Sequence, residues 1–284
     1  MVVFAGQGDA RRSMDLLWRT EGAPPSQGGP GPRPALSVDA IVAAAVAIAD
    51  TQGMAALSMR AVGERLGRTA MALYTYVPGK SELLDVMYDA VHAELPDPAG
   101  SGDWREDLTA WSGSALDFYV RHPWVLQISQ ARPVLGPHEY AALDTLVRLL
   151  YGTGLDPHVV RRLTGTLFHF VRGAAQTVAD ARRAAAATGR SDEEWWTDRA
   201  GLLAEVAPDF EDRFPHVSRL ESESSPEPYQ DRGTDTDTVT DTDTDAGEHV
   251  PYLEREARRT FTTGLGVLLD GIAAAGAART APAR

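Results

Sequence analysis

The chain has 284 residues, of which 43% are hydrophobic, a formal net charge of −13 and no cysteine. The lack of cysteine excludes a disulfide framework, thiolate catalysis and a thiolate metal site. The longest apolar run, residues 40–49, is too short to span a bilayer, and the N-terminus lacks the apolar stretch of a signal peptide. We therefore expect a cytoplasmic protein with a sizeable core and no membrane partner.

The acidic charge is concentrated in one part of the chain. Residues 221–250 contain ten acidic residues and one arginine, so they carry nine of the thirteen excess negative charges. Residues 57–81 instead have a net charge of +3. Because binding depends on the local field more than on the total charge, the overall acidity does not exclude nucleic acid as a partner.

Two low-complexity segments interrupt the chain. Residues 22–34 contain nine Gly or Pro out of thirteen, so we predict that residues 1–35 are a disordered N-terminal extension. A short helix around Leu16–Trp18 and a flexible arm that touches DNA are the alternatives for this segment. Residues 221–250 are predicted to be an acidic disordered linker, because the Asp-Thr alternation repels itself. A calcium site is the alternative there, but it needs ligands at set positions around a turn glycine.

The remaining sequence predicts an all-α fold, because apolar residues recur every three or four positions and no alternating strand pattern is present. Helices are expected first at residues 37–50, 58–66, 69–74 and 81–95. Ser58 is a predicted N-cap, and Gly67 is expected to end the second helix. Further helices are expected near residues 103–121, 124–132, 138–152, 156–188, 192–206 and 251–276.

Residues 36–84 have the pattern of a three-helix, helix-turn-helix DNA-binding domain. A capped short helix, a turn glycine and a second short helix allow the second helix to enter the major groove while the first lies across the phosphates. The alternative is a small helical subdomain that never meets DNA.

Residues 73–84, LYTYVPGKSELL, are the most informative stretch. Within LSMRAVGERLGRTAMALYTYVPGKSELLDVMYDAV they resemble the DNA-binding domain of TetR-family transcriptional regulators. Residues 103–125 and 259–272 resemble the start of the ligand domain and the final dimerisation helix of the tetracycline-repressor-like subfamily. The resemblance, over about residues 36–220 and 251–276, implies a homodimeric repressor that binds double-stranded operator DNA and is released by a small-molecule effector.

The resemblance also implies which residues contact DNA. Arg60 and Lys80 would meet phosphates, and Tyr74 and Tyr76 would pack against the sugar-phosphate backbone. The whole implied set is Arg60, Thr69, Ala70, Met71, Ala72, Tyr74, Thr75, Tyr76 and Lys80. Residues 70–72 depart from relatives that carry Gln, Pro or Thr there. Apolar side chains contact thymine methyls but make no bidentate base contact, so specificity would depend on methyl contacts and DNA shape.

The helical body, residues 85–220, supplies the candidate ligand contacts. Its aromatic residues suit an apolar cavity, and His169, Arg172 and Gln176 stand at i, i+3 and i+7 on one helix face. The predicted ligand-contacting residues are Trp111, His122, Trp124, Phe168, His169, Arg172 and Gln176. The alternative for each is a core role, because aromatic residues at helical spacing usually fill a core. The helix at residues 81–95 joins the two parts and is the predicted transmitter.

Catalytic and cofactor-binding motifs are missing from the sequence. No HExxH, GxSxG, P-loop or GxGxxG occurs, and the seven histidines are dispersed. We therefore expect no enzymatic activity, no metal and no cofactor.

Two long segments, residues 156–188 and 251–276, combine broad apolar faces with many small residues. We predict that they form the dimer interface, with packing inside one chain as the alternative. The rival function is a helical ligand-binding or scaffolding protein whose DNA-reading helix has degenerated, which residues 70–72 motivate.

Overall fold

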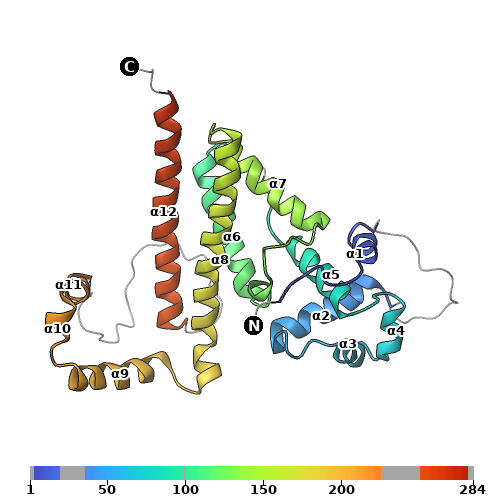
Figure 1. Cartoon of the computed structure of the whole chain (residues 1–284), viewed down its shortest axis with the longest axis horizontal. Helices are drawn as coiled ribbons and strands as arrows, with labels where there is room; N and C mark the ends of the chain where they lie inside the picture. Colours follow the sequence, from blue (N-terminus) through green and yellow to red (C-terminus); the bar gives the residue numbers. More distant parts are fainter. Residues whose placement is uncertain (1–2, 20–35, 99, 225–249, 281–284) are drawn as a thin grey trace. The chain divides into compact units, whose positions relative to one another are not determined.

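The computed structural model describes residues 3–19, 36–98, 100–224 and 250–280. These residues form helices and, among them, a single isolated β-bridge between Val3 and Ile128, which confirms the predicted all-α class (Figure 1). The helices are α1 Ala10–Leu17, α2 Val38–Gln52, α3 Met59–Arg65, α4 Ala70–Tyr74, α5 Lys80–His92, α6 Trp104–Arg121, α7 Pro137–Tyr151, α8 Pro157–Thr188, α9 Asp192–Val206, α10 Phe210–Arg213, α11 Pro215–Ser224 and α12 Tyr252–Thr280, with a short 3-10 turn η1 at Val125–Gln127.

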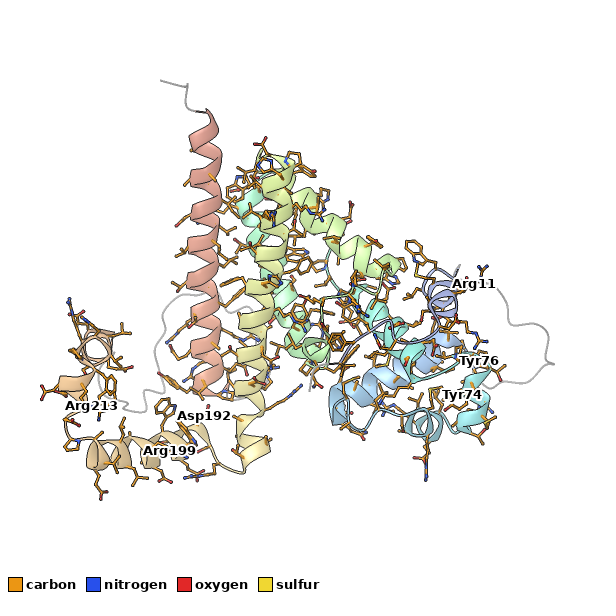
Figure 2. The ribbon with its side chains drawn as sticks, viewed as in Figure 1. Arg11, Tyr74, Tyr76, Asp192, Arg199 and Arg213 are labelled. Carbon is orange, nitrogen blue, oxygen red and sulfur yellow. The ribbon has the colours of Figure 1, made fainter. Side chains whose placement is uncertain are left out.

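The chain divides into two compact units. The first comprises Met1–Ala179 and Glu256–Arg284, and the second comprises Asp180–Arg255. The predicted boundary at residues 84 and 85 falls inside the first unit, and the predicted ligand domain is shared between both. In the second unit, α9 begins with a capping box between Ser191 and Glu194 and has no buried residue. Asp192 and Arg199 lie on this helix, and Arg213 ends α10 (Figure 2).

Local capping sets the first helices, as the sequence predicts. The hydroxyl groups of Ser37, Ser58 and Thr69 accept hydrogen bonds from backbone amides in the first turns of α2, α3 and α4. Gly67 has a φ of +64°, which only glycine adopts easily, and it turns the chain between α3 and α4. A side chain at Gly63 would meet the carbonyl oxygen of Arg68 at 2.8 Å, so this glycine lets the two helices pack closely.

The core of the first unit is continuous from the helix-turn-helix into the helical body. Helix α5 packs against α1, α2 and α7. Farther into the body, Trp111 of α6 meets Phe168 of α8 edge-on, with ring centroids 5.6 Å apart, and Phe170 of α8 stacks on Phe261 of α12. Helices α6, α8 and α12 therefore lie side by side (Figure 1).

Three sequence predictions need correction. The helix expected at residues 124–132 is wrong: only η1 forms there, and the chain continues as a loop in which Leu135 has a φ of +66°. Disorder of the whole of residues 1–35 is wrong for residues 3–19, which contain α1. The acidic linker begins later than predicted, because residues 221–224 belong to α11. Residues 225–249, the rest of that linker, lie outside the described part of the chain.

Candidate nucleic-acid interface and ligand cavity

The predicted DNA-contacting residues lie at the surface of α3, of α4 and the turns that flank it, and of the start of α5, where each is exposed or partly exposed. Met71 is 75% exposed, although it is a large apolar side chain, and Tyr74 is 44% exposed. Leu73 and Val77 point the other way and are fully buried. Helix α4 is therefore anchored by one face, and its apolar and aromatic side chains face solvent on the other. Tyr74 and Tyr76 lie at this outer edge of the first unit (Figure 2).

The cations of this surface are exposed. The Arg60 side chain is 86% exposed and pairs with Glu64 one helical turn away, at 2.8 Å. Arg65 at the end of α3 and Arg68 in the turn after it are also exposed. Both contribute to the positive charge of residues 57–81, but neither is among the predicted DNA contacts. An exposed pair of this kind adds little stability, so Arg60 can exchange its partner for a phosphate at small cost.

Lys80 has a structural contact within the chain. Its Nζ donates a hydrogen bond to the carbonyl oxygen of Leu57 at 2.7 Å, just before the N-cap of α3. An ammonium group has three donors, so this bond leaves others for a phosphate. Lys80 thus joins the start of α5 to the start of α3.

A cavity of about 360 Å³ lies in the body of the first unit. Four elements and one loop build it: α5, α6, α7, α8 and residues 128–135. Aromatic and aliphatic side chains make up much of its wall, and the polar side chains in it are His92, Ser129, Gln130, Arg132, Glu139 and His169. Such a mixture suits a small-molecule site. The main lining residues are Tyr88, His92, Tyr119, Val134, Glu139, Tyr140 and Phe168, with His169 also in contact.

Of the seven predicted ligand contacts, Phe168 and His169 line this cavity. Trp111 is fully buried behind Phe168 in the core. The Nη2 atom of Arg172 donates to the carbonyl oxygens of Val125 and Ile128, at 3.2 and 2.6 Å, so its guanidinium holds the end of η1. Gln176 is exposed on α8.

His122 and Trp124 have another role. The Nδ1 atom of His122 and the indole Nε1 of Trp124 both lie 2.8 Å from Oδ1 of Asp50, which is in the last turn of α2. The other ring nitrogen of His122 lies 3.1 Å from Glu94. Burial by itself would lower the pKa of His122, but its two carboxylate partners outweigh burial and raise the pKa above its ordinary value. These residues tie the helical body to the first helix of the helix-turn-helix.

Most of the cavity was missed by the sequence analysis. Tyr88 and His92 stand at i and i+4 on α5, a spacing that places both on one face, and this was the available signal. The loop at residues 128–135 gave none, because the predicted helix at residues 124–132 covers most of it.

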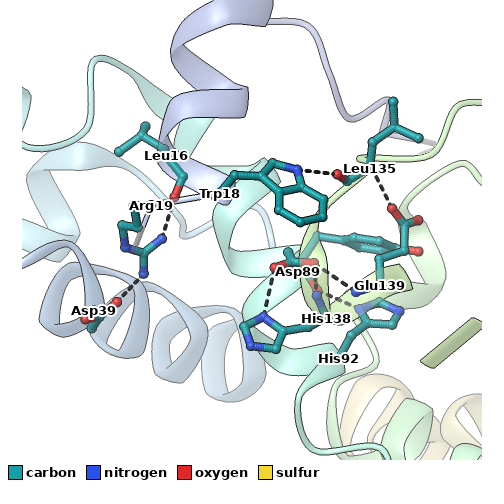
Figure 3. Close-up of polar contacts among 10 residues, drawn as sticks. Leu16, Trp18, Arg19, Asp39, Asp89, His92, Leu135, His138 and Glu139 are labelled. Carbon is teal, nitrogen blue, oxygen red and sulfur yellow. Dashed lines mark hydrogen bonds and ion pairs between the residues drawn. The ribbon is translucent and has the colours of Figure 1, made fainter. Parts of the chain in front are cut away.

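Helix α5 also carries a row of buried acids, Glu82, Asp85 and Asp89. Asp89 caps another helix: its Oδ1 accepts from the backbone amides of His138 and Glu139 at the start of α7, at 3.0 and 2.9 Å. Its Oδ2 lies 2.9 Å from the ring of His138 (Figure 3). Since α7 forms a cavity wall, Asp89 fixes that wall on α5.

The other two acids hold the N-terminal segment. Asp85 accepts hydrogen bonds from the amide of Gly6 at 2.7 Å and from the hydroxyl of Ser13 at 2.9 Å. Glu82 accepts from the amide of Asp9 at 2.9 Å. At the other end of α1, the indole of Trp18 donates to the carbonyl of Leu135 in the cavity loop (Figure 3). Residues 3–19 therefore form a strap between α5 and the cavity wall.

Two models of known protein families match this chain. Residues 41–87 match the family model described as bacterial regulatory proteins, tetR family. Residues 95–235 match the model described as tetracyclin repressor-like, C-terminal domain. The HTH-type transcriptional repressor DrrR1 of Streptomyces coeruleorubidus is 40% identical over 223 residues, which cover 78% of this chain and 80% of that protein.

Solved structures show the same fold. The apo form of ActR from Streptomyces coelicolor aligns with a TM-score of 0.63 at 23% identity, over 86% of this chain and 98% of that one. ActR in complex with actinorhodin aligns with a TM-score of 0.59 at 23% identity, over 84% of this chain and 96% of that one.

Proposed function

Because this chain belongs to the TetR family of bacterial regulatory proteins, we propose that it is a homodimeric transcriptional repressor whose DNA binding is relieved by a small molecule. Its place of action would be the cytoplasm, where bacterial operator DNA lies, and its role would require no catalytic chemistry and no cofactor. The similarity to a named repressor over most of both chains supports repression as the mode of action.

The proposal assigns DNA reading to α4 and phosphate contact to α3 and α5. Thr69, Ala70, Met71, Ala72 and Thr75 would face base edges or the groove wall, with Tyr74 and Tyr76 on the backbone. Exposed Met71 supports this role, because a large apolar side chain in solvent is better explained by a partner surface such as thymine methyls. Arg60 and Lys80 would neutralise phosphates, which gives affinity without sequence preference.

One observation supports the proposed response to a ligand. Helix α5 begins at Lys80, on the surface proposed to face DNA, and ends at His92 in the cavity wall. A helix of this length spans about 18 Å as a rigid rod. A molecule that repositions the His92 end therefore moves the Lys80 end and the spacing of the recognition helices. The strength of the response equals the difference in the molecule's affinity for the DNA-competent and the released form.

Dimerisation would bury the outer faces of α8 and α12. On α12, Phe261, Leu265 and Leu269 face the core, while Val267 is 67% exposed on the opposite side among small residues. Of the helices that the structure describes, α12 also has the length and composition of a membrane span over Tyr252–Ala277. Packing against a second copy accounts for its exposed apolar face, and two copies present two recognition helices to half-sites one DNA turn apart.

Selection from a pool of random DNA duplexes tests the proposal. We expect enrichment of an inverted repeat whose half-site centres are about 34–36 Å apart, and protection of both half-sites in a footprint. Failure to enrich any sequence over several rounds would contradict operator recognition and favour the rival ligand-binding or scaffolding function.

A further inference from the structure

His122 is a buried histidine between the helix-turn-helix and the helical body. It directly follows α6, and 4% of it is exposed. Its two ring nitrogens meet carboxylates from two other elements. Nδ1 lies 2.8 Å from Asp50 in the last turn of α2, and Nε2 lies 3.1 Å from Glu94, just beyond the end of α5. One side chain therefore connects the body with the first helix of the helix-turn-helix and with the end of α5.

This geometry requires the charged form of the ring. A carboxylate oxygen only accepts, so each ring nitrogen must supply a hydrogen, and a histidine that donates from both nitrogens is an imidazolium. Both carboxylates have a second donor that favours their ionised form: the indole of Trp124 donates to Asp50 at 2.8 Å, and Nη2 of Arg121 lies 3.0 Å from Glu94.

The ring of His92 on α5 is the further titratable group beside this cluster. His92 and His122 both pack against Phe118, with ring centroids 5.2 and 5.5 Å from it. Burial lowers the pKa of His92, so its ring stays neutral and adds no positive charge. For His122 burial acts in the same direction, but the hydrogen bonds to Asp50 and Glu94 outweigh it and raise the pKa.

Loss of the His122 proton would place a nitrogen lone pair against a carboxylate oxygen. Two acceptors repel each other, so one of the two links must open, and a group left without its donor in a buried site costs free energy. The helix-turn-helix would then be attached to the body less firmly. DNA binding would have to restore the fixed attachment, and such ordering reduces affinity.

Given the proposed function, we propose that protonated His122 is a positioning residue for operator binding: it fixes the helix-turn-helix on the body through Asp50 and Glu94. Operator DNA then binds most tightly to the chain that carries this proton, and by linkage bound DNA strengthens the binding of the proton. Because the folded pKa lies above the ordinary value, operator affinity is highest below about pH 6.5 and falls as the pH rises through the folded pKa.

The test measures the affinity of the full chain for its selected operator by fluorescence anisotropy, at constant salt and at a series of pH values from about 6 upward. The wild-type affinity should fall about threefold to tenfold, the change expected when DNA shifts the pKa of one histidine by about half a unit to one unit. His122→Gln does not titrate, so it should lose this fall and keep the weaker affinity throughout. A flat wild-type profile, or a fall that His122→Gln retains, would overturn the proposal.

His138→Gln is the matched control for the loss of a histidine. His138 also meets a carboxylate, that of Asp89 at 2.9 Å, but through Nδ1 and at the start of α7. This variant should keep the wild-type pH profile. A profile that disappears in His138→Gln and survives in His122→Gln would move the titrating group to α7.

Two further variants separate the charged link from simple packing. Glu94→Gln keeps an oxygen for Arg121 but removes one negative charge, so His122 should hold its proton less tightly and the fall in affinity should move to lower pH. Trp124→Phe removes the indole bond to Asp50 and no titrating group, so it should lower affinity at every pH without moving the fall. An unmoved fall in Glu94→Gln would contradict the charged link.

A measurement without DNA separates this proposal from the proposed function. The NMR signal of the Trp124 indole, identified by its loss in Trp124→Phe, should shift with pH in the wild type and stay constant in His122→Gln, because Trp124 and His122 share one oxygen of Asp50. This titration with no selected operator would leave the charged link standing and remove the repressor proposal. An operator bound with an affinity that ignores pH would keep the repressor and overturn the role of His122.

Discussion

The recognition surface and the cavity lie in the same compact unit but are assembled in different ways. The surface comes from one continuous stretch between Ser58 and Lys80, set by caps, a turn glycine and short helices. The cavity draws on residues from Tyr88 to His169 and depends on contacts between parts that are distant in sequence. Local rules therefore determine where the predicted DNA-contacting residues lie, and long-range packing determines where the cavity forms.

The two regions meet on α5. Its first residue, Lys80, belongs to the recognition surface, and its last, His92, belongs to the cavity. Between them, three buried acids bind the N-terminal strap and cap α7. Each region can accordingly be disturbed at its own residues with the other intact.

The largest effect should come from the proposed dimer face of α12, because binding to two half-sites requires two subunits. Val267→Asp places two like charges close to the proposed two-fold axis, so we expect monomers in analytical ultracentrifugation. Operator affinity should fall by about a hundredfold to a thousandfold, because the second half-site no longer adds to the first. Val206→Asp, at an exposed position on α9, is the matched control and should remain dimeric. If Val206→Asp gives monomers and Val267→Asp remains dimeric, the dimer interface includes α9 rather than α12.

Changes at Lys80 should break recognition and spare the cavity. Lys80→Glu should reduce operator affinity about a hundredfold by repelling phosphate in both subunits. Because Nζ also donates to Leu57, Lys80→Gln is the sharper variant: its amide keeps a donor for that carbonyl and removes only the charge. It should weaken binding about tenfold and lower the salt slope by about one per half-site, as fluorescence anisotropy measures. An unchanged slope would show that Lys80 does not meet a phosphate.

Changes at Asp85 should release the N-terminal strap and lower the stability of the fold. Asp85→Ala leaves the Gly6 amide and the Ser13 hydroxyl without their acceptor, and should lower the free energy of unfolding by about 2 kcal/mol. Asp85→Asn should cost much less, because burial already raises the pKa of Asp85. The amide oxygen can still accept from Gly6, and the amide NH2 can donate to the Ser13 hydroxyl oxygen with the direction of that bond reversed. Urea titration measures both. Equal losses from the two variants would mean that the charge of Asp85, rather than its hydrogen bonds, holds the strap.

The smallest effect concerns the link from His122 to Asp50. The folded state binds the His122 proton more tightly than the unfolded state, since the pKa of His122 is raised. Its contribution to stability is therefore complete below about pH 6.5 and is lost as the pH rises through the higher folded pKa. The gap in melting temperature between wild type and His122→Gln should narrow as the pH rises above about 6.5. A gap that widens with pH would contradict this sign.

The contrast between the helix-turn-helix, which forms from local patterns, and the cavity, which forms from distant segments, explains what the sequence could predict. Ser37, Ser58, Gly67 and Thr69 act within a few residues of their own positions, so the helix-turn-helix followed from local patterns. His122 and Trp124 meet Asp50 across more than 70 positions, and no spacing rule reaches that far. Both were read as ligand contacts because a polar or aromatic side chain in a helical body suits either role.

The prediction that residues 1–35 are disordered was wrong for residues 3–19 for a related reason. The composition of this segment argued for disorder, and α1 is too short to be stable alone. The N-terminal segment is held by Glu82 and Asp85. In the sequence, nothing distinguishes these two residues from acidic residues on the exposed face of a helix. Tertiary contacts thus stabilise α1, which the sequence offered only as an alternative, and a cavity loop where the sequence predicted a helix.

The most direct test of the account is a salt-dependent binding titration of the full chain on the DNA upstream of its own gene, with a scrambled duplex of equal length as control. We expect tight binding to the upstream DNA alone, with two chains per site and an affinity that falls steeply with salt. Equal, weak binding to both duplexes at every salt concentration would contradict operator recognition by α4.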